Sequence, residues 1–255
     1  MKIISYNIKC DDTIADIKPE FQWKKRKKEL AEQIDKFDAD IIGMQEVMPH
    51  QQDYFMKKLG CKYNAVYQSR DDNASNGEGC PIFYIKSKFN LLRSETFWLS
   101  ESPQILASIS WNSRWPRICT YLILEDKKSN KKFAIFNTHL DHKSENAKIN
   151  GIKLIISKIK EMGLPTILTG DFNASRDTEP VEICKKELTY ANINNDNCIT
   201  FHLWGQPEIL QEGKRYIDYI FVKDMKVKSY KVLNDIKDAT KISDHFALQS
   251  EIEFI

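Results

Sequence analysis

The chain has 255 residues, of which 42% are hydrophobic, so it can bury one large core or two small ones. Its 38 basic and 36 acidic side chains give a net charge of +2, which excludes a dedicated basic coat protein for nucleic acid. The six cysteines are scattered, without a CxxC pair or zinc-type spacing, and indicate small hydrophobic side chains in a reducing compartment, the cytoplasm.

Short runs rich in β-branched and aromatic residues recur along the chain, and each has the length of a strand and polar or turn residues at its ends. In chain order these runs are residues 2–8, 39–47, 62–68, 80–86, 117–126, 131–140, 165–172, 215–222, 227–233 and 246–255. Ser129 and Asn130, between the fifth and sixth runs, predict a hairpin. No apolar stretch reaches the roughly 18 residues of a membrane span, and the first residues lack a signal-peptide layout.

Helical spacing of apolar residues predicts two helices, and proline placement predicts a third. The first helix carries the stripe Trp23, Leu30, Ile34 and Phe37, the second carries apolar residues from Ile152 to Met162, and the third begins at Pro180. A further helix is indicated over residues 48–59. The lysine-rich run at residues 23–28 lies beside the first stripe, so it predicts a solvated helix face.

Many strands with a few interspersed helices indicate an α/β (α+β) sheet protein. No linker or internal repeat divides the sequence, and a single domain over residues 1–255 is expected.

Acids, amides and histidines lie inside or at the ends of these apolar runs. They are Asn7, Glu46, His139, Asp171, Asn173, Asp218, Asp244 and His245. An unpaired carboxylate in such surroundings costs several kcal/mol, and a shared cleft holding a cation such as Mg²⁺ would compensate it. Taken singly, each residue also has a structural interpretation: Asn7 could bond a neighbouring strand, Glu46 could cap the helix at 48–59, and Asp171 to Asn173 could form an Asx turn.

The ordered motifs SYN, QE, NTHLDH, TGDFN, IDYIF and SDH, which run from Asn7 to His245, resemble the endonuclease/exonuclease/phosphatase superfamily of DNase I-like phosphoesterases. The order and separation of the motifs are specific, although GDFN or SDH alone would be weak. The resemblance implies a four-layered α/β/β/α sandwich, in which two mixed β-sheets pack face to face and are flanked by helices. The segments QEVMPHQ, GEGCPIFY, FWLSESP and FNTHLDH are similar to a bacterial group distantly related to the deadenylase and nocturnin branch.

The resemblance also implies roles for the matched residues. Glu46 is the main metal-holding carboxylate, helped by Asn7 and Asp244, and the expected cofactor is one or two Mg²⁺ or Mn²⁺ ions. Asp171 resembles the residue that orients and deprotonates the attacking water. Asn173 would hydrogen-bond the phosphate or the nucleophile.

Two histidines are matched to groups that contact the phosphate. His245 resembles the histidine on the scissile phosphate, with Asp218 placed to hold its ring and favour its charged form. His139 occupies the position of a second phosphate-contacting side chain.

Three further residues are expected to bind substrate. Glu78 belongs to a GEG run that lies near the site in similar proteins, although it could be a simple turn residue. Arg117 could reach a phosphate or form an exposed salt bridge. His202 lies in a variable region before the last strands and is expected to touch the substrate.

The favoured function is a metal-dependent phosphodiesterase or nuclease that acts on nucleic acid, a nucleotide or a small phosphodiester by in-line attack of an activated water. Trp98, Trp111, Trp115 and Arg117 could supply stacking and charge for such a substrate. The alternative is a phosphomonoesterase or a phosphoesterase of lipid headgroups or inositol phosphates. A non-catalytic binding module is disfavoured because every matched residue is present, and no obligate protein partner is expected.

Overall fold

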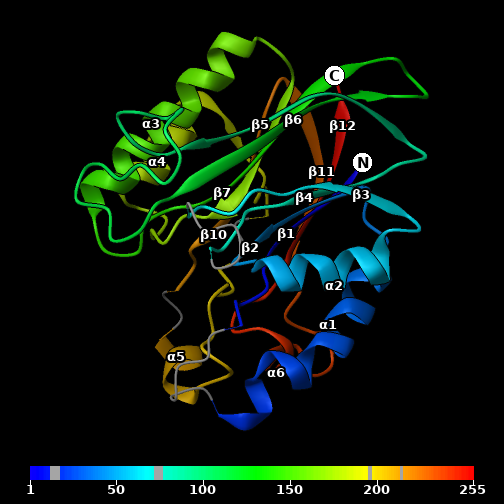
Figure 1. The fold of residues 1–255 in the computed structure, drawn as a ribbon, viewed down its shortest axis with the longest axis vertical. Coiled ribbons are helices and arrows are strands. Elements are labelled where there is room, and N and C mark those ends of the chain that lie inside the picture. Colours follow the sequence, from blue (N-terminus) through cyan, green and yellow to red (C-terminus); the bar gives the residue numbers. More distant parts are fainter. Residues whose placement is uncertain (12–17, 72–76, 195–196, 213–214) are drawn as a thin grey trace.

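The computed structural model describes residues 1–11, 18–71, 77–194, 197–212 and 215–255, and these form two six-stranded sheets (Figure 1). The first sheet has the strand order β11-β12-β1-β2-β4-β3. Its strands are β1 (Lys2–Asn7), β2 (Ile41–Gln45), β3 (Tyr63–Val66), β4 (Ile82–Ile85), β11 (Met225–Val232) and β12 (Leu248–Phe254). The second sheet has the order β5-β6-β7-β8-β10-β9. Its strands are β5 (Phe89–Trp98), β6 (Ile118–Asp126), β7 (Lys132–His139), β8 (Thr166–Asp171), β9 (Thr189–Tyr190) and β10 (Asp218–Lys223).

Helices cover the outer face of each sheet, so the molecule has four layers. Helices α1 (Trp23–Lys36) and α2 (Pro49–Leu59) lie on the first sheet, and α3 (Glu145–Met162) and α4 (Glu179–Glu187) lie on the second (Figure 1). Two short helices, α5 (Pro207–Glu212) and α6 (Ala239–Ile242), and the 3-10 turn η1 (Pro19–Phe21) lie in connections. The predicted α/β/β/α sandwich is therefore confirmed.

Both sheets are mixed, because each contains one parallel pair of strands at its centre. Strand β1 runs parallel to β2, and β7 runs parallel to β8, whereas the other paired strands are antiparallel. A parallel pair requires a crossover connection, which α1 provides in the first sheet and α3 in the second. The central strands are buried on both faces, and this explains why their sequences read as continuous apolar runs.

A polar contact between the sheets fixes their relative position next to the strand ends. Asn137 of β7 donates a hydrogen bond through Nδ2 to the carbonyl of Met44 (2.7 Å) and accepts one at Oδ1 from Gln45 Nε2 (2.7 Å). The backbones can approach because β2 has a glycine here: a Cβ on Gly43 would collide with Thr169 Oγ1. This network lies within two residues of Glu46 in the first sheet and of His139 in the second.

All ten predicted runs contain strands, and the predicted hairpin joins β6 to β7 with Asn130 in the left-handed region (φ 56°). Strands β5 and β9 were not predicted. Each lies at an edge of its sheet, and the middle of β5 is exposed, with Leu91 39% and Leu92 47% accessible. All six cysteines are free thiols, but Cys61 is exposed, so the prediction of small hydrophobic side chains does not hold for that residue.

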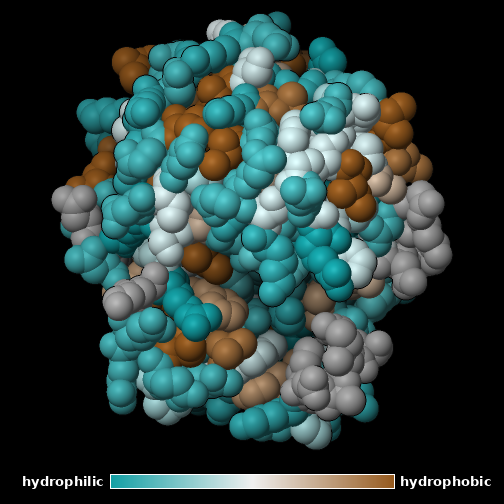
Figure 2. All heavy atoms as spheres, turned by 90° about the vertical axis from the view of Figure 1, so that its left-hand side faces the viewer, coloured by the Kyte–Doolittle hydropathy of each residue, from teal (hydrophilic) through white to brown (hydrophobic). Residues whose placement is uncertain are grey.

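The surface on the side of α3 and α4 carries mostly hydrophilic side chains, with apolar groups scattered among them (Figure 2). Within the described ranges, no helix combines the length and the apolar character needed to cross a bilayer.

Trp23, the first residue of α1, is expected to act in packing. It is 6% exposed and makes edge-to-face contacts with Tyr54 and Phe55 of α2, with ring centroids 5.5 and 5.6 Å apart. We expect Trp23→Ala to lower the free energy of unfolding by about 3–5 kcal/mol, because it leaves a cavity between the helices and the sheet. Denaturant unfolding measures this loss, and Trp115→Ala, at a position 46% exposed, is the control with little change. An unchanged stability of Trp23→Ala would contradict the packing assignment.

Candidate active site

The predicted site residues meet at one edge of the paired sheets. Strands β1, β2, β7 and β8 end at this edge, and their antiparallel neighbours β4, β6 and β10 begin there. Strand pairing places Asp171, the last residue of β8, between His139 on β7 and Asp218 on β10. Asn7 ends β1 beside Gln45, so the next residue of that chain segment, Glu46, joins the same edge.

Asp171 lies at the centre of the cluster and is 1% exposed. Its Oδ2 accepts a hydrogen bond from Asn7 Nδ2 (3.0 Å), and its Oδ1 accepts one from the backbone N–H of Asn173 (2.9 Å). The second bond is an Asx turn, and it holds Asn173 in the left-handed region (φ 48°). The structural interpretation of this motif is therefore correct, and the same turn brings the Asn173 carboxamide to the site.

The surroundings raise the pKa of both Asp171 and His245, for different reasons. Burial, followed by the nearby Asp218 carboxylate, raises the pKa of Asp171 to about 7. Burial alone would lower the pKa of His245, but the Asp218 carboxylate, which accepts a hydrogen bond from His245 Nδ1 at 2.9 Å, outweighs it and raises that pKa to about 10. The Nε2 atom of His245 lies 3.8 Å from Asp171 Oδ2. A cationic imidazole thus stands beside a carboxyl group that ionises near neutral pH.

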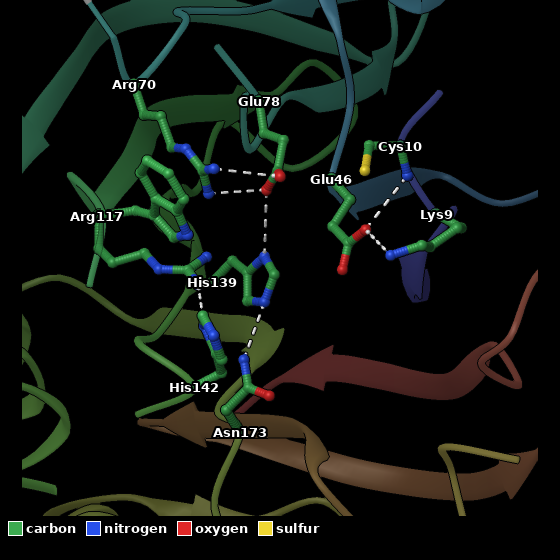
Figure 3. A pocket seen from close by; sticks show the side chains of 10 residues that line it. Lys9, Cys10, Glu46, Arg70, Glu78, Arg117, His139, His142 and Asn173 are labelled. Carbon is green, nitrogen blue, oxygen red and sulfur yellow. Dashed lines mark hydrogen bonds and ion pairs between the residues drawn. The ribbon is translucent and has the colours of Figure 1, made fainter. Parts of the chain in front are cut away.

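His139 differs from His245 in charge. Burial, followed by the Arg117 guanidinium, holds the pKa of His139 well below its usual range, so its imidazole is neutral. Its Nε2 accepts a hydrogen bond from Asn173 Nδ2 (2.9 Å) and lies 3.5 Å from Asp171 Oδ2. Its Nδ1 faces Glu78 Oε2 at 3.9 Å (Figure 3). The predicted second histidine therefore lies in the cluster as a hydrogen-bonding group without charge.

Glu46 points into the same cleft and is held by three groups. Its Oε1 accepts a hydrogen bond from Asn7 Nδ2 (3.1 Å), and its Oε2 accepts one from the backbone N–H of Cys10 (3.1 Å) and pairs with Lys9 Nζ (3.2 Å). Although burial opposes ionisation, the Lys9 ammonium holds the pKa of Glu46 well below its usual range. Glu46 does not cap α2, because the N-cap residue of that helix is Met48.

The donor set around Glu46 suits a hard divalent cation. Asp244 is 4% exposed, and its Oδ1 has no hydrogen-bond partner among the described residues. A buried carboxylate oxygen without a partner is available to bind a ligand such as a cation. Two carboxylates at one cavity match the way proteins hold Mg²⁺ or Mn²⁺. Asn7 turns its amide nitrogen toward both Glu46 and Asp171, so ligation through its oxygen requires a rotation of the amide. The metal roles of these three residues stay predictions.

Two clusters of potential metal-ligand atoms occur in the part of the chain that the structure describes. One consists of Cys10, Glu46 and Glu78, and the other of Asp171, Asp218 and His245, with ligand atoms within 4.8 Å of one another in each. Glu46 belongs to the first cluster and Asp171 to the second, so charged ligand groups lie on both sides of the cleft.

The cleft has two lobes that meet at Lys9, Glu46 and Asn173. The first lobe, drawn in Figure 3, has a volume of ≈ 310 Å³, and the second has ≈ 440 Å³. The first is lined in addition by Cys10, Arg70, Glu78, Trp115, Arg117, His139 and His142. The second is lined in addition by Asp171, Ser175, Phe201, Leu203, Arg215, Ile217, Asp244 and His245. The first lobe is therefore rich in basic groups, and the second holds the carboxylate and histidine pair.

Glu78 and Arg117, two of the residues expected to bind substrate, lie in the first lobe. Glu78 pairs with both terminal nitrogens of Arg70, at 2.8 and 3.1 Å. Arg117 is only 5% exposed, so the alternative of an exposed salt bridge is wrong. His202 lies elsewhere: it is 0% exposed, packs on the ring of Phe246 and lines neither lobe. This position does not support the predicted contact between His202 and substrate.

Arg26 is a further residue of the site that the sequence did not reveal. The prediction of a solvated helix face is wrong for it, because its side chain is 2% exposed. Its guanidinium donates hydrogen bonds to five carbonyls, those of Ile8, Lys9, Cys10, Phe21 and Ile242. It thus ties the loop that carries Lys9 and the Cys10 amide to the segment just before Asp244 and His245. Arg26 is the one arginine of the basic run and lies on the apolar stripe between Trp23 and Leu30, but its carbonyl partners lie in segments that no local pattern brings together.

We expect Arg26 to position the Glu46 side of the cleft. Arg26→Met leaves five carbonyls without their donor, so stability should fall by a few kcal/mol and kcat/KM by about tenfold or more. Thermal unfolding and kinetics at saturating and limiting Mg²⁺ measure the two effects. Lys28→Met, on the same helix with an 82% exposed side chain, is the matched control. A loss of stability with unchanged activity of the folded fraction would show that Arg26 has no positioning role.

The architecture and the edge site together define an α/β-sandwich hydrolase. The chain belongs to the Endonuclease/Exonuclease/phosphatase family, whose model matches residues 4–245, and the family predicted from the sequence is thereby confirmed. Members of this family hydrolyse phosphoesters and generally use divalent metals.

Solved structures resemble the whole chain. An endonuclease/exonuclease/phosphatase from Bacteroides vulgatus is 31% identical with a TM-score of 0.91, covering 100% of this chain and 98% of its own. The mannosyl-6-phosphatase Bt3783 from Bacteroides thetaiotaomicron is 32% identical with a TM-score of 0.88, covering 100% of both chains.

Curated relatives match over shorter parts. Protein angel of Drosophila melanogaster is 26% identical over 71% of this chain and 54% of its own length. Nocturnin of Rattus norvegicus is 28% identical over 68% of this chain and 40% of its own length. The chain spans about half or less of these longer proteins, and the predicted similarity to the nocturnin branch is confirmed.

Proposed function

We propose that this chain hydrolyses phosphoesters by in-line attack of a water molecule, with a divalent metal ion as cofactor. The observation that carries the proposal is the pair formed by Asp171 and His245 at the junction of two buried sheets. A carboxylate whose pKa is about 7 can take a proton from water at neutral pH. The cationic imidazole beside it can donate a hydrogen bond to a phosphate oxygen as negative charge develops there.

The other residues of the cluster orient these two groups. Asn7 and the Asx turn hold the Asp171 carboxylate by both oxygens, and Asp218 fixes the ring of His245. Asn173 donates hydrogen bonds through Nδ2 to His139 Nε2 and to the Leu140 carbonyl, and so holds the neutral imidazole beside the Asp171 carboxylate. Glu46, Asp244 and Asn7 would hold Mg²⁺ or Mn²⁺, which supplies positive charge to the phosphate oxygens.

Among phosphoesters, a compact substrate such as a nucleotide or a sugar phosphate fits the site best. Each lobe encloses a few hundred Å³, and the lysine and arginine side chains that line the two lobes are Lys9, Arg70, Arg117 and Arg215. A long nucleic-acid footprint requires a Lys or Arg for each neutralised phosphate, and the net charge of +2 does not provide a large basic surface. The similarity of the whole chain to a mannosyl-6-phosphatase supports the phosphomonoesterase alternative.

A nuclease that removes nucleotides from an end is the second candidate. It is favoured by the similarity to the CCR4-Not complex 3'-5'-exoribonuclease subunit Ccr4 of Mycosarcoma maydis, 24% identical over 61% of this chain and 30% of its own length, and by the exposed Trp115 on the cleft wall, on which a base could stack. Both candidates use the same residues at the phosphate.

The test is hydrolysis of a substrate panel by the metal-stripped protein with and without added Mg²⁺ or Mn²⁺. The panel contains nucleotides, sugar phosphates, inositol phosphates and end-labelled RNA and DNA, and the Asp171→Asn protein is the blank. We expect turnover of at least one class, its loss in chelator and its recovery when metal is restored. Full activity of the metal-stripped protein would contradict the role of the metal. Equal rates with the blank across the panel would contradict the proposed function.

A further inference from the structure

Arg117 carries a buried charge that has no carboxylate at hydrogen-bond distance among the described residues. Its guanidinium contacts the ring of His142, with Nη2 donating to His142 Nδ1 at 3.1 Å. Its Nε and Nη1 atoms are buried and have no hydrogen-bond partner among the described residues. A buried guanidinium is normally paired, because a charge out of water without partners is strongly destabilising.

Asp141, the nearest carboxylate, is already engaged in a turn. Its Oδ1 accepts hydrogen bonds from the backbone N–H groups of Lys143 (2.9 Å) and Ser144 (2.7 Å), and its Oδ2 accepts one from that of Arg114 (2.9 Å). Its Oδ2 lies 3.7 Å from Arg117 Nε, which is beyond hydrogen-bond distance. Asp141 therefore shapes the loop around Arg117 and offsets its charge only in part.

The other cations of the first lobe already have carboxylate partners. Lys9 pairs with Glu46 at 3.2 Å, and Arg70 forms its two-pronged contact with Glu78. Arg117 thus differs from both, since it lines the same lobe without a carboxylate at hydrogen-bond distance. Trp115 lines the same lobe and is 46% exposed, and the Arg114 guanidinium lies 5.2 Å from the centroid of its ring.

Arg117 lines a different lobe from the two residues proposed to act on the reacting phosphate. Arg117 and Trp115 line only the first lobe, whereas Asp171 and His245 line only the second. A small cavity of ≈ 10 Å³ beside Arg117, Arg70 and His139 has room for one water at most, so an anion must approach from the open lobe.

We propose that the first lobe binds a second phosphate-type group of the same substrate, held by Arg117, with a sugar or base ring against Trp115. The inference rests on the proposed function and narrows its substrate class to phosphoesters that carry a second phosphate group. Bisphosphorylated nucleotides, bisphosphorylated sugars and short oligonucleotides share this chemistry. A guanidinium suits it because it is always charged and donates charge-assisted hydrogen bonds to phosphate oxygens.

The test compares ligands that differ by one phosphate. Asp171→Asn protein is titrated calorimetrically with adenosine 3′,5′-bisphosphate and adenosine 3′-monophosphate, and with fructose 1,6-bisphosphate and fructose 6-phosphate. We expect at least one bisphosphate to bind about tenfold or more tightly than its monophosphate. Adding Arg117→Met should remove this ratio, whereas Arg117→Lys should keep part of it. Arg93→Met, at a 62% exposed arginine on β5, is the matched control and should leave the ratio unchanged.

A modest loss of stability does not change the ratio of the two affinities. Thermal unfolding shows whether the Arg117→Met protein folds. If it does not fold, the affinity ratio of the Arg117→Lys protein is used in its place. The nucleotide and sugar pairs distinguish the two sources of the second phosphate. Equal affinities within both pairs, or a ratio that survives Arg117→Met, would overturn the inference and leave a bound water as the partner of Arg117. An Arg117-dependent preference in a protein whose wild type hydrolyses none of the panel would instead overturn the proposed function and keep this site.

Discussion

Replacing Asp171 with asparagine should lower kcat by about 10²–10⁴-fold while the protein stays folded, because it removes the base but keeps the shape of the side chain. Asn7 and the backbone of Asn173 both donate to the present carboxylate, and asparagine can still accept one of these bonds. Steady-state kinetics on the best substrate of the panel measure the effect. Asp177→Asn, an exposed aspartate six residues further along the chain, is the matched control.

Asp171→Asn should raise the stability of the metal-free protein, although it lowers kcat. The folded-state pKa of Asp171 is about 7, above its usual value of 3.8, so the ionised carboxylate destabilises the fold. The wild type should lose stability as the pH rises from about 4 to 7, and the neutral asparagine should not. In metal-free protein, the melting temperature of Asp171→Asn should therefore exceed that of the wild type at pH 8, with a difference that vanishes toward pH 4.

Two outcomes would contradict this account of Asp171. A kcat within a few-fold of the wild type would remove Asp171 from the role of base. A lower melting temperature at pH 8 would show that the charged carboxylate stabilises the fold, and that its hydrogen bonds outweigh its burial. Gains in stability at the expense of activity are common where an active site holds a strained or buried charge.

Much of the fold could be predicted because its central strands are buried on both faces. Continuous apolar runs such as residues 165–172 leave few alternatives, and turn residues such as Asn130 mark their ends. Strand β5 was not predicted because the polar residues Arg93 to Thr96 interrupt its apolar ends, and its middle faces solvent. Strand β9 has two residues and depends on pairing with β10, which no local pattern reveals.

The site was partly predictable for a related reason. Polar residues inside apolar runs are conspicuous, and pairing strands brings Asn7, His139, Asp171 and Asp218 to one edge. Residues whose role depends on the direction of one side chain were missed. Lys9 reaches Glu46 from a left-handed backbone position (φ 57°) that its sequence context does not announce.

The exposure of a lysine or arginine could not be read from the sequence either. Arg26 is buried and donates to five carbonyls, whereas Lys24, Lys25 and Lys28 of the same run face solvent. The place of Arg70 in the site was identified only from its contact with Glu78 in the structure. Which member of a basic run turns inward depends on the tertiary neighbours of the helix, here the loop after β1 and the end of α6.

Asp218→Asn should reduce activity strongly at alkaline pH and less at acidic pH. Asp218 keeps His245 protonated up to a pKa of about 10, and without its charge the burial of the imidazole dominates and lowers that pKa. The alkaline limb of the kcat/KM profile should therefore move to lower pH. Removing the same charge also lowers the pKa of Asp171, since Asp218 repels its ionised form, and the acidic limb should move in the same direction.

A pH profile from 5.5 to 9.5 tests this displacement, with Asp224→Asn as control because Asp224 follows the far end of β10 and its side chain is 63% exposed. A loss of activity of equal size at every pH would show that Asp218 only orients the ring of His245, and that the imidazole acts without its charge. A shift of both limbs to lower pH would instead show that one buried carboxylate sets the ionisation of the cation and the base together. Such coupling follows from the short distances in the cluster, where Asp171 lies 3.8 Å from the ring that Asp218 holds.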